Sequence, residues 1–221
     1  MKKFAVLAAA ATMAVSAPAM AQFFEGFEHG DWLGNYAVIS GSATPINLVA
    51  DAARTGALGA QFQASGWWKN TNAGATISDG QSYEYYFRSA GAGRAYIGFT
   101  SDDAATEAYT VVAAPNTGNV IIQRNNGFGF ADLASTPITW STTDFYRVAA
   151  SYSGGIISVE VFDAGGASLG SAMADTGYSG GGTLFYRGFS NVQVDDVTIV
   201  PAPASLALLG LGGLAATRRR R

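Results

Sequence analysis

Cysteine is absent from the 221-residue chain, and histidine occurs only once, as His29. Without thiolates, a zinc–cysteine site, an iron–sulfur cluster and a cysteine nucleophile are excluded. A histidine-based metal site or a Ser-His-Asp triad would have to be built around His29. No serine motif accompanies that residue, so we interpret it as a turn residue.

Basic residues are scarce once the two ends of the chain are set aside. Lys2, Lys3 and the four C-terminal arginines make up six of the 13 basic residues, whereas all 16 acidic residues lie between these ends. The intervening body is therefore about nine charges negative. Such a surface repels nucleic acid phosphates and anionic lipid, so we expect no nucleic acid partner, while cations and neutral glycans remain compatible.

A sustained apolar period of three to four residues is also missing from residues 22–200, which predicts little helix and no parallel βαβ topology. The body instead alternates aromatic and β-branched residues with polar ones, separated by Gly, Asn, Asp and Ser. We expect strands over 82–88, 95–100, 108–112, 119–123, 145–152, 156–162, 184–189 and 192–199. About a dozen short strands joined by tight turns predict a single all-β domain over 22–200, an antiparallel β-sandwich.

The N-terminus has the parts of a secretory signal peptide. Lys2 and Lys3 precede an apolar run over 4–15, and Ala19 and Ala21 form an Ala-x-Ala cleavage site. We expect residues 1–21 to be removed, leaving Gln22 as the mature N-terminus. The alternative, an N-terminal membrane anchor, needs a longer apolar stretch.

The C-terminus, residues 201–221, combines three features in order. The first is a pair of prolines with one residue between them, Pro201, Ala202 and Pro203, and the second is an uncharged run over 204–216. The third is a basic end that consists of Arg218, Arg219, Arg220 and Arg221. As a helix, residues 201–217 would span roughly 25 Å, which is less than the ~30 Å hydrocarbon core. Crossing a membrane would therefore need snorkelling arginines or a locally thinned bilayer.

This order resembles the PEP-CTERM sorting tail of exopolysaccharide-producing Gram-negative bacteria, with Ala202 in place of the usual Glu. The resemblance implies that an exosortase, a membrane cysteine protease-transpeptidase, recognises the tail and releases or attaches the protein outside the cell. The membrane would then be contacted only through the tail, transiently at the inner membrane, before delivery to the surface or extracellular matrix. An ordinary C-terminal anchor or an incidental apolar tail is the alternative.

The body resembles the concanavalin A-like jelly roll of the laminin G and pentraxin type. The resemblance rests on an aromatic opening at 23–28, a segment with Trp32 and Tyr36, a hairpin over 145–163 and a last strand with Asp195 and Asp196. It implies a jelly-roll sandwich and raises the question of glycoside hydrolysis.

Glycosidases need two carboxylates ~5 Å apart for retention or ~6.5–9.5 Å apart for inversion. Glu84 and Glu160 stand alone on their expected strands, which we place next to each other, and Asp195 and Asp196 should point to opposite faces as solvated residues. We therefore expect no catalytic site.

Trp67, Trp68, Lys69 and Asn70 are the candidate glycan contacts. Indole faces stack on pyranose rings, and Lys and Asn can bond sugar hydroxyls. In a strand, alternation sends one indole inward and the other outward, so the outward one is the candidate. The alternative is that both tryptophans fill the core or cover its edge.

Two acidic groups are candidate calcium ligands, because calcium binds several carboxylate and carbonyl oxygens and related jelly rolls often carry such a site. The groups are Glu25, Glu28 and Asp31 near the mature N-terminus, and Asp102 and Asp103 in a later loop. Neither has EF-hand spacing. Calcium is therefore a hypothesis, and no other cofactor is expected.

Together these observations favour a non-enzymatic exported β-sandwich that serves as a structural or glycan-contacting component of the cell surface or exopolysaccharide matrix. The first alternative is a secreted carbohydrate-active enzyme of the concanavalin A-like superfamily with an unusual carboxylate pair. The second is an adhesion module that binds protein partners through its loops.

Processing at both ends gives the first testable prediction. Intact-mass analysis of protein isolated from the native host should show a chain that begins at Gln22 and lacks Arg221, because the leader and the sorting tail are both removed. Secreted material that still carries the arginine run would contradict the interpretation of the tail.

Overall fold

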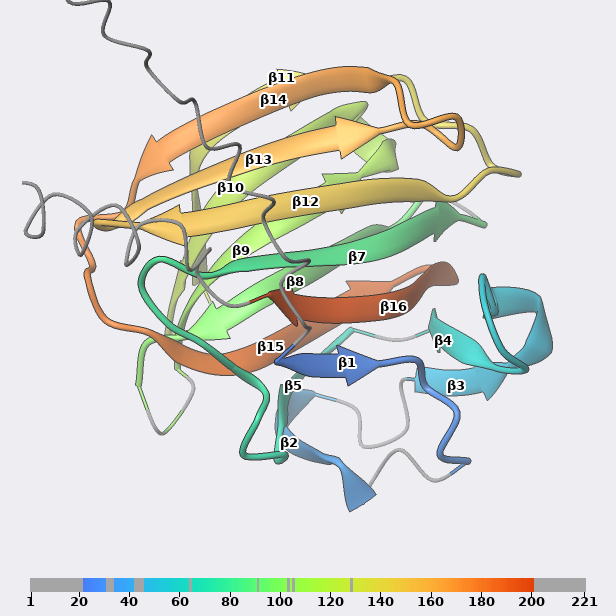
Figure 1. Cartoon of the computed structure of the whole chain (residues 1–221), viewed down its shortest axis with the longest axis horizontal. Coiled ribbons are helices and arrows are strands. Elements are labelled where there is room, and N and C mark those ends of the chain that lie inside the picture. Colours follow the sequence, from blue (N-terminus) through green and yellow to red (C-terminus); the bar gives the residue numbers. More distant parts are fainter. Residues whose placement is uncertain are drawn as a thin grey trace, which may run out of the picture. The chain divides into compact units, whose positions relative to one another are not determined.

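The computed structural model describes residues 22–30, 34–41, 46–63, 65–90, 92–102, 104, 106–127 and 129–200. The signal peptide and the sorting tail predicted above lie outside these residues. The described residues form sixteen strands and two single-turn 3-10 helices, η2 (Ala50–Ala52) and η3 (Pro115–Thr117). The strands make two antiparallel sheets packed face to face (Figure 1). The all-β sandwich expected from the sequence is confirmed.

The first sheet, here sheet A, contains the first and last strands of the sandwich. Its order is β14 (Ser168–Asp175), β13 (Ile156–Phe162), β12 (Tyr146–Ser153), β7 (Ser82–Ser89), β16 (Val192–Val200), β4 (Gly59–Phe62) and β3 (Ile46–Val49). The short strand β1 (Phe23–Glu25) pairs with the second half of β16.

The second sheet, sheet B, packs behind sheet A in Figure 1. Its order is β11 (Gly129–Pro137), β10 (Asn119–Asn126), β9 (Glu107–Ala114), β8 (Arg94–Thr100), β15 (Gly182–Phe189), β5 (Gly66–Asn70) and β2 (Tyr36–Gly41). The two-residue strand β6 (Thr76–Ile77) pairs with β15.

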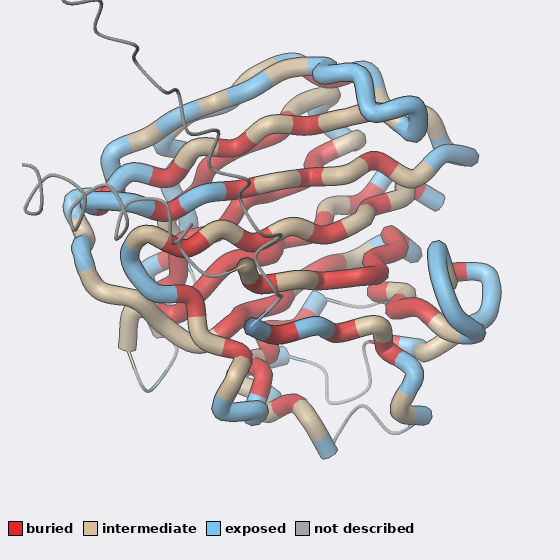
Figure 2. The backbone as a smooth tube through the Cα atoms, viewed as in Figure 1, coloured by how far each residue is buried: buried red, intermediate tan, exposed pale blue. Residues whose placement is uncertain are grey.

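Alternating burial along the strands of sheet A defines the core, as the banding of the tube in Figure 2 shows. On β7 the side chains of Tyr83, Tyr85 and Phe87 are buried, whereas those between them are half-buried. Buried tyrosines need partners for their hydroxyls. Tyr83 Oη donates to the Ile97 carbonyl of β8 and Tyr85 Oη to the Val111 carbonyl of β9, both at 3.3 Å. Burial raises the pKa of both phenols, which keeps them neutral.

The hairpin predicted over 145–163 is confirmed by β12, β13 and the turn between them. Gly154 and Gly155 have φ values of 59° and 81°, a backbone conformation that favours glycine, and they connect the two strands directly.

A β-bulge interrupts β16. Asp195 is opposite Tyr86 of β7, but the next paired residue is Thr198, opposite Glu84, so β16 contains one extra residue. The extra residue is Asp196, whose backbone φ of 50° lies in the left-handed region. The bulge lets Val194 and Val197, three positions apart, both face the core.

The bulge also holds the segment 50–58 against the sheet. Asp195 Oδ2 accepts hydrogen bonds from the backbone N–H groups of Arg54 and Thr55 at 2.6 and 3.1 Å. Asp196 accepts from the Arg54 guanidinium at 2.6 Å and from the Thr55 hydroxyl at 2.5 Å. Both carboxylates are buried and bind the same segment. The prediction that they point to opposite faces as solvated residues is therefore wrong, because the left-handed bulge residue breaks the alternation.

Asp195 should make stability depend on pH. Burial raises its pKa from 3.8 to about 6, so the folded chain binds this proton more tightly than the unfolded chain does. The stabilisation is present at pH 4 and is lost as the pH rises through about 6, by on the order of 2–3 kcal/mol. Urea unfolding of the wild type and Asp195→Asn between pH 4 and 7 measures it.

The difference between the two unfolding free energies should change over this range, because asparagine does not titrate. Asp144→Asn, a change at an exposed residue, is the control and should run parallel to the wild type. A constant difference between wild type and Asp195→Asn would contradict the assignment.

Candidate functional site

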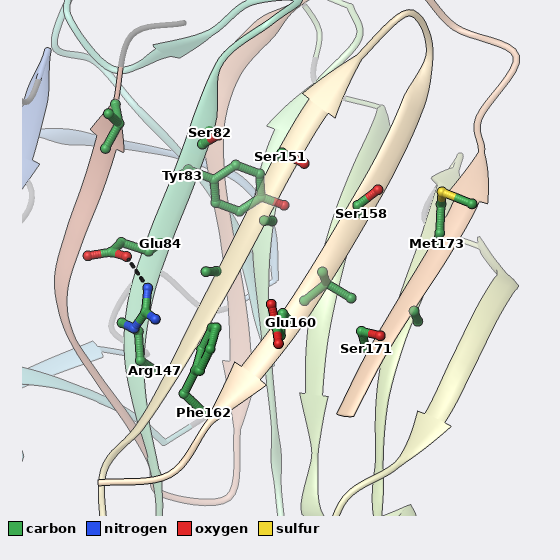
Figure 3. A pocket seen from close by; sticks show the side chains of 15 residues that line it. Ser82, Tyr83, Glu84, Arg147, Ser151, Ser158, Glu160, Phe162, Ser171 and Met173 are labelled. Carbon is green, nitrogen blue, oxygen red and sulfur yellow. Dashed lines mark hydrogen bonds and ion pairs between the residues drawn. The ribbon is translucent and has the colours of Figure 1, made fainter. Parts of the chain in front are cut away.

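A shallow groove of about 660 Å³ lies on the outer face of sheet A, across β7, β12, β13 and β14 (Figure 3). Residues of these strands whose side chains alternate away from the core form its surface. They are Ser82, Glu84, Arg147, Ala149, Ser151, Ser158, Glu160, Phe162, Ser171 and Met173.

Strand register arranges these side chains in rows across the sheet. One row runs Glu84, Ala149, Glu160, Ser171, and the next runs Ser82, Ser151, Ser158, Met173. Alanine and serine side chains are short, so the sheet is hollowed along these rows. The longer side chains of Arg147, Phe162 and Met173 border the hollow.

Arg147 holds one side of the groove together. Its Nη1 forms an ion pair with Glu84 Oε2 at 3.0 Å, drawn as the dashed line in Figure 3. Its guanidinium also lies over the Phe162 ring, 3.9 Å from the centroid. A guanidinium stacked on an aromatic face while it binds a carboxylate has little freedom to move. The charge of Glu84 is thereby neutralised within the groove wall.

Glu160 is in a different position. It is half-buried on the groove floor, and no ion pair or hydrogen bond of its side chain is found among the residues that the structure describes. Its carboxylate therefore remains available to a ligand in the groove.

Glu84 and Glu160 are separated by a whole strand. Both are paired with Ala149 of β12, one from each side, so their backbones are two strand spacings apart, about 9.5 Å. The prediction that they occupy adjacent strands is wrong. This spacing falls near the inverting range, but Glu84 is bound to a guanidinium and is poorly placed to deliver a proton to a leaving group.

Trp67 and Trp68 do lie on opposite faces of β5, yet neither is exposed. Trp68 is 0% exposed within the core, and Trp67 is 6% exposed on the other face of sheet B. Trp67 packs edge-on against Phe185, with ring centroids 5.3 Å apart, and beneath the Arg187 guanidinium at 4.8 Å. Trp67 therefore faces outward but is covered by side chains on the outer face of sheet B, which agrees with the alternative that both tryptophans fill the core or cover its edge.

The two residues that follow do not change this result. Lys69 is half-buried, and Asn70 is buried, with its Oδ1 accepting a hydrogen bond from the Asn72 N–H at 2.8 Å. The segment from Trp67 to Asn70 therefore offers no flat aromatic surface for a sugar ring.

The Glu25 carboxylate, a candidate calcium ligand, is bound by protein donors. It accepts hydrogen bonds from the Phe27 N–H at 2.8 Å and from the Tyr36 hydroxyl at 2.6 Å. His29, which lies in the turn expected for it, places Nε2 3.2 Å from the same carboxylate. This cluster ties the start of the sandwich to β2.

The other calcium candidates also cap backbone groups. Glu28 Oε1 accepts from the N–H groups of Ala57 and Leu58, and Asp102 accepts from the Glu107 N–H and the Thr106 hydroxyl. Asp31 and Asp103 lie outside the described residues. Within the described ranges, no three His, Asp or Glu side chains converge on a point where a metal could bind.

Comparison with known sequences identifies the C-terminal tail. Residues 200–221 match the PEP-CTERM protein-sorting motif, as the residue pattern predicted. No curated protein matches the chain. In the part of the chain that the structure describes, no helix has the length and apolar character needed to cross a bilayer.

Comparison with solved structures supports the jelly-roll sandwich. The carbohydrate-binding module CBM66 from Bacillus subtilis is 12% identical, with a TM-score of 0.58 over 75% of this chain and 95% of that one. The T. cruzi calreticulin globular domain is 10% identical, with a TM-score of 0.55 over 90% and 95%. The exoplasmic domain of VIP36, in a form bound to Ca²⁺ and Man3GlcNAc, is 13% identical, with a TM-score of 0.50 over 75% and 84%.

Burial of both tryptophans gives a stability prediction. Trp67→Ala and Trp68→Ala should each lower the free energy of unfolding by about 3–5 kcal/mol, because each removes a buried indole. Phe24→Ala, which removes an aromatic side chain that is 59% exposed on β1, is the control and should cost less than about 1 kcal/mol. Denaturant unfolding measures all three. A neutral Trp67→Ala would restore the exposed indole of the sequence prediction.

Proposed function

We propose that this chain is an exported, non-enzymatic β-sandwich that contacts glycans through the groove on sheet A. The observation that carries the proposal is the groove itself. It is an open hollow on the surface of the sheet, lined by serine hydroxyls and two carboxylates and bordered by the side chains of Arg147, Phe162 and Met173. The protein itself acts as a structural component of the cell surface or the exopolysaccharide matrix.

Export follows from the sorting motif at 200–221, which implies processing by an exosortase after transient anchoring in the membrane. The final location, at the surface or in the matrix, is part of the proposal. The acidic surface of the mature body fits a matrix role, because it repels anionic lipid and nucleic acid.

The chemistry of the groove suits sugar hydroxyls. A serine hydroxyl both donates and accepts, and a carboxylate accepts two or more hydrogen bonds. Ser82, Ser151 and Ser158 form one row of such groups, and Glu84 and Glu160 belong to the next. Because all of them project from three consecutive strands of one sheet, their spacing is fixed before a ligand arrives, which lowers the entropic cost of binding.

Similar folds also support the proposal. The Bacillus subtilis protein is named as a carbohydrate-binding module, and VIP36 was solved with a mannose-containing glycan. We infer by analogy that a sandwich of this kind can present a glycan site, and the residues of the groove supply the chemistry for one here.

The spacing of Glu84 and Glu160 favours one second candidate, an inverting glycosidase. That mechanism requires one carboxyl group to protonate the leaving group and the other to activate water. The Arg147 guanidinium occupies the Glu84 carboxylate, which opposes either role for Glu84. We therefore expect binding without turnover.

Filling the groove tests the proposal. The Ala149 side chain points away from the core, so Ala149→Tyr should occupy the floor between Glu84 and Glu160 without disturbing the fold. The wild type should be retained on a panel of insoluble and oligomeric glycans, and the variant should lose at least about 90% of that retention. Reducing-sugar release on the same panel should stay at background.

Ser153→Tyr is the matched control, because Ser153 is exposed on the same strand and lies outside the groove. It should bind like the wild type. Equal binding by the Ala149 variant, or no glycan binding by the wild type, would refute the groove as the site. Reducing-sugar release that Glu84→Gln or Glu160→Gln abolishes would establish the glycosidase instead.

A further inference from the structure

We propose that the groove on sheet A selects a glycan that carries protonated amines, such as a polymer of glucosamine. This inference rests on the proposed function and adds the chemical class of the ligand. Its basis is the balance of charges in the groove, where one of the two lining carboxylates has no cationic partner among the described residues.

The guanidinium groups on the outer face of sheet A are already neutralised by carboxylates of the chain. The ion pairs are Arg54 with Asp196 at 2.6 Å, Arg88 with Asp51 at 3.3 Å and Arg147 with Glu84 at 3.0 Å. Each guanidinium also lies over an aromatic ring, at 3.4, 4.8 and 3.9 Å from the centroids of Tyr86, Phe145 and Phe162 respectively. These cations are therefore held in place and are not available to bind an anionic ligand.

Of the two carboxylates that line the groove, Glu160 is the one for which the described residues provide no such partner. Because Glu84 is neutralised by Arg147, Glu160 gives the groove a net charge of minus one. The mature body adds to the negative potential of the groove, since it has seven basic and 16 acidic residues. A negative potential concentrated in a hollow attracts cations and disfavours anions.

The position of Glu160 suits a primary amine on a sugar. It is half-buried beside Ala149 and in the row that ends at Ser171, so an ammonium group there can form a charge-assisted hydrogen bond while the sugar hydroxyls contact the serines. An N-acetylated sugar has no charge to offer. A uronic acid would bring a second carboxylate against Glu160.

Titration calorimetry with three hexasaccharides tests the inference at a mildly acidic pH. The ligands are glucosamine, N-acetylglucosamine and galacturonic acid oligomers. The wild type should bind the glucosamine oligomer about tenfold more tightly than the acetylated one, the difference expected of one charge-assisted contact, and should not bind the acid. Raising the salt concentration should shrink the preference.

Glu160→Gln keeps the shape of the side chain and removes its charge, so it should abolish the tenfold preference for the glucosamine oligomer over the acetylated one. Asp144→Asn removes one charge from an exposed residue outside the groove and should keep the preference.

Equal affinity for the amino and acetylated oligomers, or a preference that survives Glu160→Gln, would overturn the inference. If Ala149→Tyr still eliminates binding in that case, the proposed groove function stands without the amine selectivity. If neither the amino nor the acetylated oligomer binds the wild type, the amine selectivity is refuted, and both proposals fail if the wild type also binds nothing on the wider glycan panel.

Discussion

The bulge in β16 is the constraint on which the rest of the sandwich depends. This strand pairs with β7 on one side and with β4 and then β1 on the other. Because side chains alternate between faces, a shift of one residue would turn the outward residues of β16 toward the core. The extra residue at Asp196 absorbs that shift, so Val194 and Val197 both stay inside, and the bulge carboxylates also hold segment 50–58 in place.

The groove arises from the same alternation on the opposite face of sheet A. The tyrosines of β7 that point inward bridge to the backbone of sheet B, so β7 has a fixed position and orientation. Its outward residues then align with those of β12 and β13. Short side chains in two neighbouring rows create the hollow, and the ion pair of Arg147 with Glu84 leaves Glu160 as the groove carboxylate whose charge is not compensated.

Strands with alternating aromatic and β-branched residues, such as β7, β12 and β13, could be predicted from the sequence together with the turn at Gly154 and Gly155. The edge strands β11 and β14 could not, because small and polar residues occupy both faces and no apolar period of two marks them in the sequence. The sequence left open whether Trp67 is exposed or buried, because alternation alone does not show that sheet B buries side chains on both faces. Neither the groove nor the separation of Glu84 from Glu160 could be predicted, because both follow from which strands pair and in which register.

The pairing of the first and last strands has a mechanical consequence. Phe23 is opposite Ile199, so the two ends of the sandwich emerge beside each other, and β16 is hydrogen-bonded along both edges near residue 200. Tension applied at that end, along the strand, would load the bonds to β7 and β1 together in shear, and they would have to break as a group. A chain tethered through its C-terminal end would thus transmit a pull into the middle of sheet A, where many bonds resist it at once.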